Sequence, residues 1–450
     1  MSDFSGLRVT VLGLGRHGGG IGAARFLARR GARVTISDQL SADELAGSLA
    51  ALADVPIERF SLGGHRECDV READLVVVNP AVRPSSPVLS AAAAQGIQLT
   101  SEIELFLRHC PARVIGVTGT NGKSTTATLS AAMLRAAGQR CWLGGNLGGS
   151  LLDSVDAIGA DDWVVLEVSS FQLARLANDC PGPANAIVTN CTPNHLDWHG
   201  KWSEYVAAKQ RLLQMQPATG MAFVGPVDEL DRWRACVRGS FYTAKELPDA
   251  PQTGSWPHHL RLNAKLAAAA AAAAGVGQSA IEQALTQFQP LDHRQQAIAD
   301  VAGRTFVDDS KATTPEATIA ALASLKRSEP RRRVWLLAGG SDKQCDFAPL
   351  GSAIARGLGG VACYGAVGRR LSVQLAAAAP DTTLVVCKTL DEALAWCWRN
   401  SAAGDTVLLS PACASHDQYA DYVARAGHFR QLVDGLAKSH NAAVSPAAVS

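Results

Sequence analysis

The sequence of 450 residues lacks a strong charge of either sign and any long apolar run. Lys and Arg total 42 against 41 Asp and Glu, so the net charge is +1. A protein that binds nucleic acid or a membrane surface through its phosphates needs a basic excess, which is missing here. The longest nearly apolar stretch, residues 266–274, is mostly alanine and shorter than the ~18 residues of a transmembrane helix. We therefore expect neither a nucleic-acid partner nor a membrane partner.

Paired cysteines are missing as well. The 11 cysteines are scattered singly without a C-x-x-C motif, which argues against a disulfide framework and against a zinc site. The first residues include an early acidic residue and no long apolar core, so they do not resemble a secretory signal. Apolar residues make up 47% and charged residues 18%, which excludes a disordered chain. These features predict a globular protein of the cytoplasm.

Short apolar segments alternate with alanine-rich segments that favour helices. Unbroken apolar segments are typical of strands buried on both faces, as in parallel sheets with helices between the strands. At ~150 residues per domain, this α/β chain is expected to form about three domains. Boundaries near Pro111 and Pro290 give domains 1–111, 112–290 and 291–450. The clearest predicted strands are residues 8–12, 33–37, 74–79, 113–118, 163–168, 186–190, 334–338 and 406–410.

A glycine-rich turn follows the first predicted strand. Gly13, Gly15 and Gly18 form a G-x-G-x-x-G pattern before a helical segment, and the next strand leads to Asp38. Glycines let the backbone approach a diphosphate, and the N-terminus of the following helix offers unpaired N–H groups to it. We favour a nucleotide other than a nicotinamide dinucleotide, but a dinucleotide site and a purely structural turn are both consistent with the pattern. The first domain is predicted to be Rossmann-like.

The strongest motif follows predicted strand 113–118. It is the phosphate loop Gly119-Thr120-Asn121-Gly122-Lys123-Ser124-Thr125, with a helical segment after it. Its glycines allow a loop whose N–H groups point at phosphate oxygens. Lys123 would reach the β- and γ-phosphates, and the Ser124 hydroxyl is placed to ligate Mg²⁺. Val117 stands where the strict pattern has its first glycine, so this is a shortened variant. Two such turns predict ATP in one domain and a nucleotide-linked substrate in the other.

Candidate metal ligands follow the phosphate loop in the sequence. Glu167 stands at the end of a buried strand, where ligands bind in open α/β sheets, and we interpret it as a Mg²⁺ ligand rather than a solvated charge. His195 also follows a strand, and it is either a structural histidine or a group that faces the triphosphate. Lys209 lies in a helical segment, and the residues alone indicate an ordinary surface charge there.

Taken together, these segments resemble the Mur ligases, ATP-dependent amide-forming enzymes of peptidoglycan synthesis. Segment 167–173 is similar to the form found in the family member that adds glutamate to UDP-N-acetylmuramoyl-L-alanine. Seven motifs match in order along nearly the whole chain, at residues 119–124, 167–173, 192–197, 292–294, 308–313, 339–343 and, as one C-terminal motif, 410–419 with 425–429. The resemblance implies a Rossmann-like first domain, a central parallel sheet of the P-loop ATPase type and a Rossmann-like C-terminal domain.

The resemblance also implies roles for single residues. Catalytic roles fall to Lys123, Glu167, His195 and Lys209. Two Mg²⁺ ions would be held by Ser124, Glu167, His195 and Lys209, the last as a carbamate. ATP would contact the phosphate loop together with Asn263, Arg294 and Asp309. The UDP-linked substrate would contact Gly13, Gly15, Asp38, Asn146, Ser169 and Gln172. Glutamate would contact Lys311, Thr313, Lys343, Ser415 and Tyr422.

The implied reaction adds D-glutamate to UDP-N-acetylmuramoyl-L-alanine through an acyl phosphate formed from ATP, in a monomeric enzyme. Folylpolyglutamate synthase shares the ATP loop and ligase chemistry but lacks a glycine-rich first domain, so that alternative is disfavoured. An NAD-dependent oxidoreductase with an accessory ATPase would oxidise NADH. A non-catalytic nucleotide-binding protein would release no phosphate in the presence of both substrates. The last two alternatives are therefore separable by a simple assay.

Overall fold

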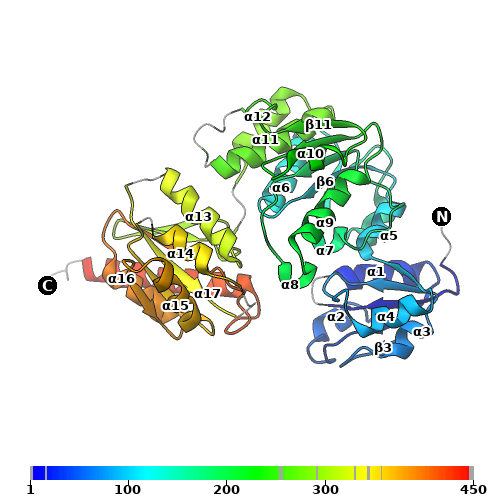
Figure 1. Cartoon of the computed structure of the whole chain (residues 1–450), viewed down its shortest axis with the longest axis horizontal. Helices are drawn as coiled ribbons and strands as arrows, with labels where there is room; N and C mark the ends of the chain where they lie inside the picture. The colour runs from blue at the N-terminus through cyan, green and yellow to red at the C-terminus, as the bar shows by residue number, and fades with distance from the viewer. Residues whose placement is uncertain are drawn as a thin grey trace, which may run out of the picture. The chain divides into compact units, whose positions relative to one another are not determined.

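The computed structural model describes residues 4–15, 18–251, 253, 256, 258–289, 292–328, 331–341, 345–355 and 357–444. Lys343, predicted to contact glutamate, lies outside the described residues. The chain divides into two compact units, Met1–Phe288 and Gln289–Ser450, coloured blue to green and yellow to red in Figure 1. In this described part of the chain, no helix has both the length and the apolar character needed to cross a membrane.

The first unit begins with a five-stranded parallel sheet in the order β3-β2-β1-β4-β5. Its strands are β1 (Arg8–Leu12), β2 (Arg33–Ser37), β3 (Ile57–Ser61), β4 (Leu75–Val78) and β5 (Gln98–Thr100). Its helices are α1 (Gly19–Arg29), α2 (Ala46–Ala50), α3 (Glu67–Arg71), α4 (Pro87–Ala94) and α5 (Glu102–His109). The chain moves outward in opposite directions from β1 and β4, so the loops after these two strands flank the switch point where doubly wound sheets bind ligands.

A six-stranded parallel sheet follows in the same unit, in the order β11-β10-β9-β6-β8-β7. Its strands are β6 (Arg113–Thr118), β7 (Cys141–Gly145), β8 (Trp163–Glu167), β9 (Asn185–Val188), β10 (Met221–Val224) and β11 (Ser240–Thr243). Its helices are α6 (Lys123–Ala136), η1 (Leu152–Ala157), α7 (Ser170–Leu173), α8 (Leu196–His199), α9 (Trp202–Gln214), α10 (Leu230–Arg234), α11 (His258–Ala273) and α12 (Gln278–Gln287). Helices α6, α11 and α12 cover one face, where alanines allow α11 to approach α6 closely.

The second unit contains a six-stranded sheet in the order β12-β13-β17-β14-β15-β16. Its strands are β12 (Gln296–Val301), β13 (Arg304–Asp308), β14 (Val334–Gly339), β15 (Gly360–Tyr364), β16 (Leu384–Val386) and β17 (Thr406–Leu409). Its helices are α13 (Pro315–Ser328), α14 (Ala348–Ile354), α15 (Gly368–Ala378), α16 (Leu390–Asn400) and α17 (Tyr422–Val444). Strand β12, which the sequence did not predict, pairs antiparallel with β13, whereas the other strands of this sheet pair parallel. The tight turn at Ala302 and Gly303 joins the pair, and both residues have positive φ.

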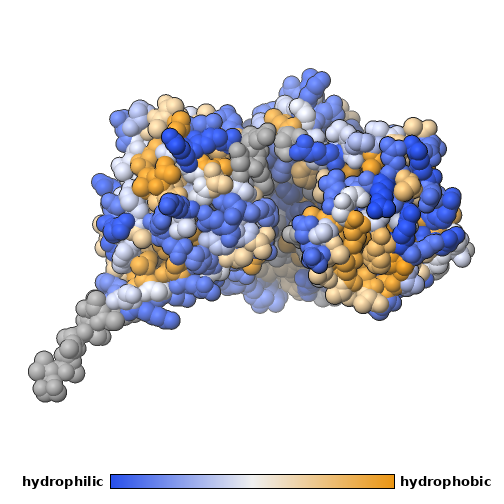
Figure 2. All heavy atoms as spheres, turned by 90° about the horizontal axis from the view of Figure 1, so that it is seen from below, coloured by the Kyte–Doolittle hydropathy of each residue, from blue (hydrophilic) through white to orange (hydrophobic). Residues whose placement is uncertain are grey.

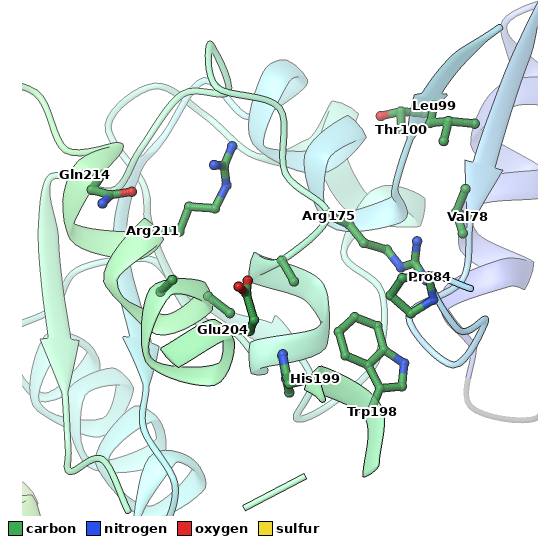
Figure 3. A pocket seen from close by; sticks show the side chains of 13 residues that line it. Val78, Pro84, Leu99, Thr100, Arg175, Trp198, His199, Glu204, Arg211 and Gln214 are labelled. Carbon is green, nitrogen blue, oxygen red and sulfur yellow. The ribbon is translucent and has the colours of Figure 1, made fainter. Parts of the chain in front are cut away.

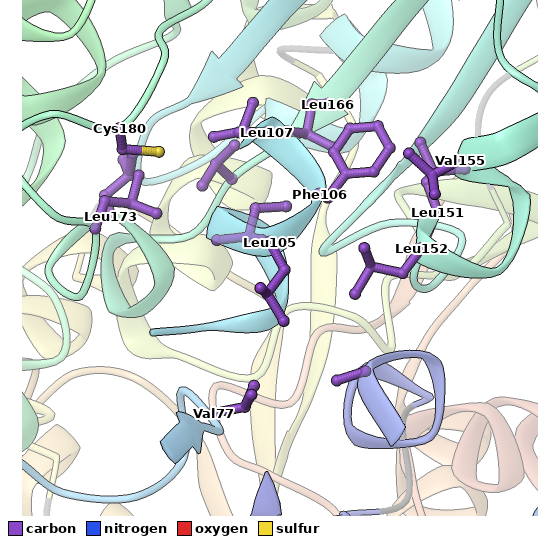
Figure 4. Close-up of a cluster of buried hydrophobic side chains, with 14 of the residues drawn as sticks. Val77, Leu105, Phe106, Leu107, Leu151, Leu152, Val155, Leu166, Leu173 and Cys180 are labelled. Carbon is purple, nitrogen blue, oxygen red and sulfur yellow. The ribbon is translucent and has the colours of Figure 1, made fainter. Parts of the chain in front are cut away.

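A shared hydrophobic core connects the first two sheets. The cluster includes Val77 of β4, Leu166 of β8 and three consecutive residues of α5 (residues 105–107). Figure 4 shows the α5 side chains between these two neighbours. This continuity explains why residues 1–288 form one compact unit although they contain two sheets. The boundaries near residues 111 and 290 stay predictions.

The surface of the described part mixes polar and apolar side chains. Figure 2 shows hydrophobic areas bordered by hydrophilic ones on the face that it presents. The exposed large hydrophobic residues include Phe60, Val373 and Val386, which belong to separate elements. Apolar side chains scattered in this way are ordinary on the surface of a globular protein.

Candidate active site

The phosphate loop is a tight turn between β6 and α6. Gly119 and Gly122 have φ of 145° and 83°, values that side chains other than glycine rarely adopt. A Cβ on Gly119 would lie 1.9 Å from Oγ1 of Thr189, and one on Gly122 would lie 2.4 Å from Oδ1 of Asn263. Lys123 donates from Nζ to the carbonyls of Gly119 at 3.0 Å and Thr120 at 2.9 Å. The turn therefore has no room for a side chain at either glycine.

Residues just beyond β9 and on α9 hold the phosphate loop in place through hydrogen bonds. The backbone N–H of Asn121 donates to Oδ1 of Asn190 at 3.0 Å, just beyond β9. Oγ1 of Thr120 lies 2.9 Å from the Tyr205 hydroxyl on α9. Ser124 and Thr125, both buried, begin α6 behind the loop. The predicted phosphate-binding residues thus share one rigid turn above the carboxyl end of the second sheet, at the N-terminus of a helix that favours anions.

Glu167 ends β8 on the strand adjacent to β6. Its side chain is 2% exposed, and Oε1 accepts a hydrogen bond from Nδ2 of Asn146 at 2.8 Å. The other carboxylate oxygen, Oε2, is buried with no hydrogen-bond partner. Burying a carboxylate oxygen without a partner costs free energy unless something binds it. Such an oxygen is a suitable ligand for Mg²⁺. The described part contains no group of three or more His, Cys, Asp or Glu side chains placed to hold one metal ion, so other ligands would have to complete the coordination.

Lys209 is buried rather than exposed, contrary to the surface charge expected from its residue type on a helix. Its side chain is 1% exposed, and Nζ donates to the carbonyl of Gly119 at 2.8 Å. Burial, followed by the nearby charge of Lys123, holds the pKa of the Lys209 amine well below its usual value. The sequence contained a signal for this burial, because Lys209 shares an apolar helix face with Tyr205 and Leu212.

His195 lies in an aromatic group beside α7. It precedes α8 with a φ of 54°, and its ring centroid lies 4.7 Å from that of Phe171. Trp198 and His199 pack on the same phenyl ring. His195, in the loop after β9, thus packs against α7, the helix that follows Glu167.

A cavity of about 420 Å³ lies at the switch point of the first sheet and extends to the second sheet. Five residues predicted to contact the UDP-linked substrate line it, namely Gly13, Gly15, Asn146, Ser169 and Gln172. The sixth, Asp38, is buried next to it: one oxygen accepts from the N–H of Gly15 at 2.9 Å and the other from Leu40 at 2.8 Å. Asp38 therefore fixes the shape of the glycine turn.

A second cavity of about 700 Å³ lies beside the first one, and no residue predicted from the sequence lines it. Figure 3 shows Arg175 next to Pro84 and Trp198, with Arg211 on α9. Arg175 donates to the carbonyl of Val82, and burial lowers the pKa of its guanidinium to about 10. The indole of Trp198 belongs to the lining of both cavities.

The second unit brings together residues predicted for ATP and glutamate. Asp309 is buried; it accepts hydrogen bonds from the Ser410 hydroxyl at 2.7 Å and from the N–H of Gln295 at 3.2 Å. Burial raises the pKa of the Asp309 carboxyl to about 7, against the opposing effects of Ser410 and Arg294. Nζ of Lys311 lies 5.6 Å from the ring centroid of Tyr422.

The other residues predicted for glutamate lie in neighbouring loops of this unit. The N–H of Thr313 donates to the carbonyl of Lys311 at 2.9 Å. Ser415 is buried in the loop after β17, where its carbonyl accepts from the N–H of Tyr419 at 2.9 Å.

Comparison with known proteins covers almost the entire chain. The Mur ligase MurD-like N-terminal domain matches residues 7–101, the Mur ligase middle domain matches 117–248, and the glutamate ligase domain of the Mur ligases matches 293–413. The chain belongs to the Mur ligase family. Within it, UDP-N-acetylmuramoylalanine--D-glutamate ligase of Roseiflexus sp. (strain RS-1) is 36% identical, covering 96% of this chain and 100% of the relative.

Further Mur ligases support this assignment. The enzyme of the same name from Acidobacterium capsulatum is 34% identical, covering 96% of this chain and 97% of the relative. Among solved structures, UDP-N-acetylmuramate-alanine ligase MurC from Thermotoga maritima superposes with a TM-score of 0.59 at 19% identity, covering 95% of this chain and 99% of that one. The structural likeness shows a common Mur ligase fold.

Two residues of this Mur ligase have positions that the sequence did not reveal. Arg425 is fully buried, and its guanidinium donates to the carbonyls of Cys413 at 3.1 Å and Ser310 at 3.0 Å, so it connects two motif loops. Glu102 lines the smaller cavity from the first position of α5. Arg425 could be suspected because it lies within a family motif, whereas the sequence around Glu102 gives no signal.

Proposed function

We propose that the chain is an ATP-dependent ligase that joins D-glutamate to UDP-N-acetylmuramoyl-L-alanine in peptidoglycan precursor synthesis. The main support is that relatives bearing the name of this activity align with at least 95% of the chain at 33–36% identity. The phosphate loop and the cavity at the switch point give the reaction two separate binding places, one for ATP and one for the nucleotide-linked substrate.

The first step activates the substrate carboxylate. One of its oxygens attacks the γ-phosphorus of ATP in line, the bond to the β,γ-bridging oxygen breaks, and an acyl phosphate and ADP result. Both partners are anions, and bringing them to ~4 Å costs several kcal/mol unless cations intervene. Lys123 supplies one positive charge to the phosphates from within the loop, after exchanging its two carbonyl contacts for phosphate oxygens.

The second step forms the amide. The neutral amine of D-glutamate adds to the acyl carbon, and inorganic phosphate leaves with the electron pair of the broken C–O bond. We propose that the incoming glutamate is surrounded by Lys311, Thr313, Lys343, Ser415 and Tyr422. His195 is a candidate to assist removal of the amine proton, although an electrostatic or ligand role fits it better. Exclusion of water protects the acyl phosphate from hydrolysis.

We propose two Mg²⁺ ions, which supply charge neutralisation at the phosphates when bound. Ser124 and the unpartnered oxygen of Glu167 would hold the first ion, and His195 would help to hold the second. We further propose that the neutral amine of Lys209 reacts with carbon dioxide: Nζ forms a bond to the carbon, one N–H proton leaves to solvent, and the product is an anionic carbamate that can act as a ligand. The support is a buried amine whose lowered pKa favours the neutral, nucleophilic form.

The remaining assignments follow the same reasoning. ATP is proposed to contact residues 119–125, and also Asn263, Arg294 and Asp309. The UDP-linked substrate is proposed to contact Gly13, Gly15, Asp38, Asn146, Ser169 and Gln172. We also propose that the enzyme acts as a monomer in the cytoplasm.

The decisive experiment incubates the purified chain with UDP-N-acetylmuramoyl-L-alanine, ATP, Mg²⁺ and each glutamate enantiomer in turn. We expect phosphate release and a product of the ligated mass with D-glutamate only. Lys123→Ala should lower turnover by ~10²–10³-fold or more, because the cation at the phosphates is lost. Lys265→Ala removes an ion pair with the exposed Asp249 and should retain activity. Product without dependence on Lys123, or consumption of NADH instead, would overturn the proposal.

A further inference from the structure

Glu102 is the acidic side chain in the lining of the smaller cavity. It begins α5, directly after β5, and its Oε1 accepts a hydrogen bond from the Ser150 hydroxyl. The rest of the lining is glycine, apolar or neutral polar, including Asn146, Ser169 and Gln172. A carboxylate is therefore placed where an anionic nucleotide sugar is proposed to bind.

Glu102 lies near the first turn of α1, to which it is connected through Ser150. Gly19 and Gly20 of that turn line the cavity. A Cβ on Gly22 would lie 2.4 Å from Oγ of Ser150, so the hydroxyl that bonds Glu102 packs directly on this turn. A diphosphate is favoured at the N-terminus of a helix, next to glycines that leave the backbone open. The Ser150 hydroxyl therefore connects the carboxyl of Glu102 to the first turn of α1, where a diphosphate is expected.

No cation in the described part of the chain forms an ion pair with Glu102. Two elements pack against the start of α5, namely η1 and α1. Their charged groups here are Asp153 of η1, and Arg25 and Arg29 of α1, both of which pair with Asp153 at 3.3 Å and 3.0 Å. Burial raises the pKa of the Glu102 carboxyl to about 7, Asp153 adds to this, and the bond from Ser150 opposes it. The group can therefore be neutral at a modest cost near pH 7.

The hydrogen bond from Ser150 also has a positional consequence. Ser150 ends the loop after β7 that contains Asn146, and Asn146 binds both the backbone and the side chain of Glu167. Gly145 and Gly149 close this loop through a hydrogen bond of 3.0 Å. Glu102 thus anchors the segment that connects the substrate cavity to the candidate metal ligand.

We propose that Glu102 binds the anionic part of the nucleotide-sugar substrate as a neutral carboxylic acid, donating its proton in a hydrogen bond while it holds the Asn146 loop through Ser150. This inference rests on the proposed function. Ionised Glu102 repels the substrate, so binding takes up a proton and weakens as the pH rises through 7. In this state the acid oxygen that accepts from Ser150 and the hydroxyl that donates to the substrate are different atoms of one side chain.

The test measures binding of UDP-N-acetylmuramoyl-L-alanine by calorimetry, without ATP or glutamate, in buffers of different ionisation enthalpy. For the wild type we expect the Kd to rise about tenfold between pH 6 and pH 8, with uptake of about half a proton at pH 7. Glu102→Gln keeps an oxygen for Ser150 and a donor for the substrate, so its Kd should be independent of pH and its proton uptake absent. Glu204→Gln removes an exposed carboxylate that lines only the larger cavity and should behave as the wild type.

The outcomes are distinguishable. If Glu102 only anchors the loop, Glu102→Gln retains the pH dependence of the wild type, and Ser150→Ala weakens binding equally at every pH; that result overturns the inference and leaves the proposed function intact. A pH-independent Kd in the wild type also overturns it. If the wild type does not bind this nucleotide sugar at all, the proposed function itself fails.

Discussion

Lys209 illustrates how much a single side chain depends on its surroundings. Its buried amine donates to the loop carbonyl of Gly119, the same carbonyl that Lys123 contacts. The charge of Lys123 and the burial of Lys209 both favour the neutral form of the Lys209 amine, which is the form that the proposed carbamate requires. We predict that Lys209→Ala lowers the ligation rate by ~10²–10³-fold, as expected for the loss of a charged group at the phosphates.

Acetate or formate should partly restore the Lys209→Ala enzyme, because a small carboxylate can occupy the vacated space. Steady-state phosphate release with and without the added acid measures this rescue. Lys201→Ala, at the exposed start of the same helix, is the matched control and should need no rescue. Full activity of Lys209→Ala without any additive would remove the carbamate hypothesis.

Asp309 should make the second unit less stable as the pH rises. Its pKa is raised from the ordinary 3.8 to about 7 in the folded chain. The unfolded chain therefore releases this proton first, and the free energy of unfolding falls by at most about 1.4 kcal/mol per pH unit between the two values. Urea unfolding from pH 4 to pH 8 measures the slope, which Asp309→Asn should abolish. Asp300→Asn, an exposed change in the same unit, should keep it; an unchanged slope in Asp309→Asn would contradict the assignment.

Residue types alone predicted some of these positions and not others. Glu167 could be found because a strand end is a recurrent place for ligands. The burial of Lys209 was missed, because a helix pattern defines an apolar face but not what covers that face. Glu102 could not be predicted for a related reason: its proposed role depends on a hydrogen bond from Ser150, which lies 48 positions away along the chain.

At the scale of elements, the turn that joins β6 to α6 should tolerate no side chain. Gly122 and Gly138 stand before and after α6, both with positive φ, but only Gly122 has a neighbour where a Cβ would be. Replacement by Ala should cost about 1 kcal/mol of stability at Gly138 and more at Gly122, where the added Cβ would meet Asn263. Only Gly122→Ala should weaken ATP binding, by roughly tenfold or more, since Asn263 must move. Calorimetric titration with ATP tests this; equal affinities in the two variants would show that the contact is unimportant.

Most interior strands of the three sheets were predicted, whereas the interior strands β10, β13 and β15 and the edge strands were not. Predicted strands 8–12, 33–37 and 113–118 are confirmed without a shift, because each is an apolar run buried on both faces. Strand β3 was missed since its residues are partly exposed and include charges, and β16 has only three residues. The antiparallel edge strand β12 was missed for the same reason, because its exposed residues interrupt the apolar pattern.

At the scale of the whole chain, two compact units should give two unfolding transitions. ATP with Mg²⁺ should raise the transition of residues 1–288, which contain the phosphate loop, by mass action. Lys123→Ala should lose this effect, and the pH dependence from Asp309 should appear in the other transition. Differential scanning calorimetry measures both. One cooperative transition in the absence of ligand would show that the units do not unfold independently.

Trp198 belongs to the linings of both cavities. Indole emission depends on the polarity and the quenchers around the ring. The chain has nine tryptophans, and we expect the emission of this one to change when either cavity is filled; the difference spectrum against Trp198→Phe isolates its contribution. The chain therefore contains an intrinsic optical reporter, and the arrival of a nucleotide sugar can be timed in a stopped-flow instrument without attaching a dye.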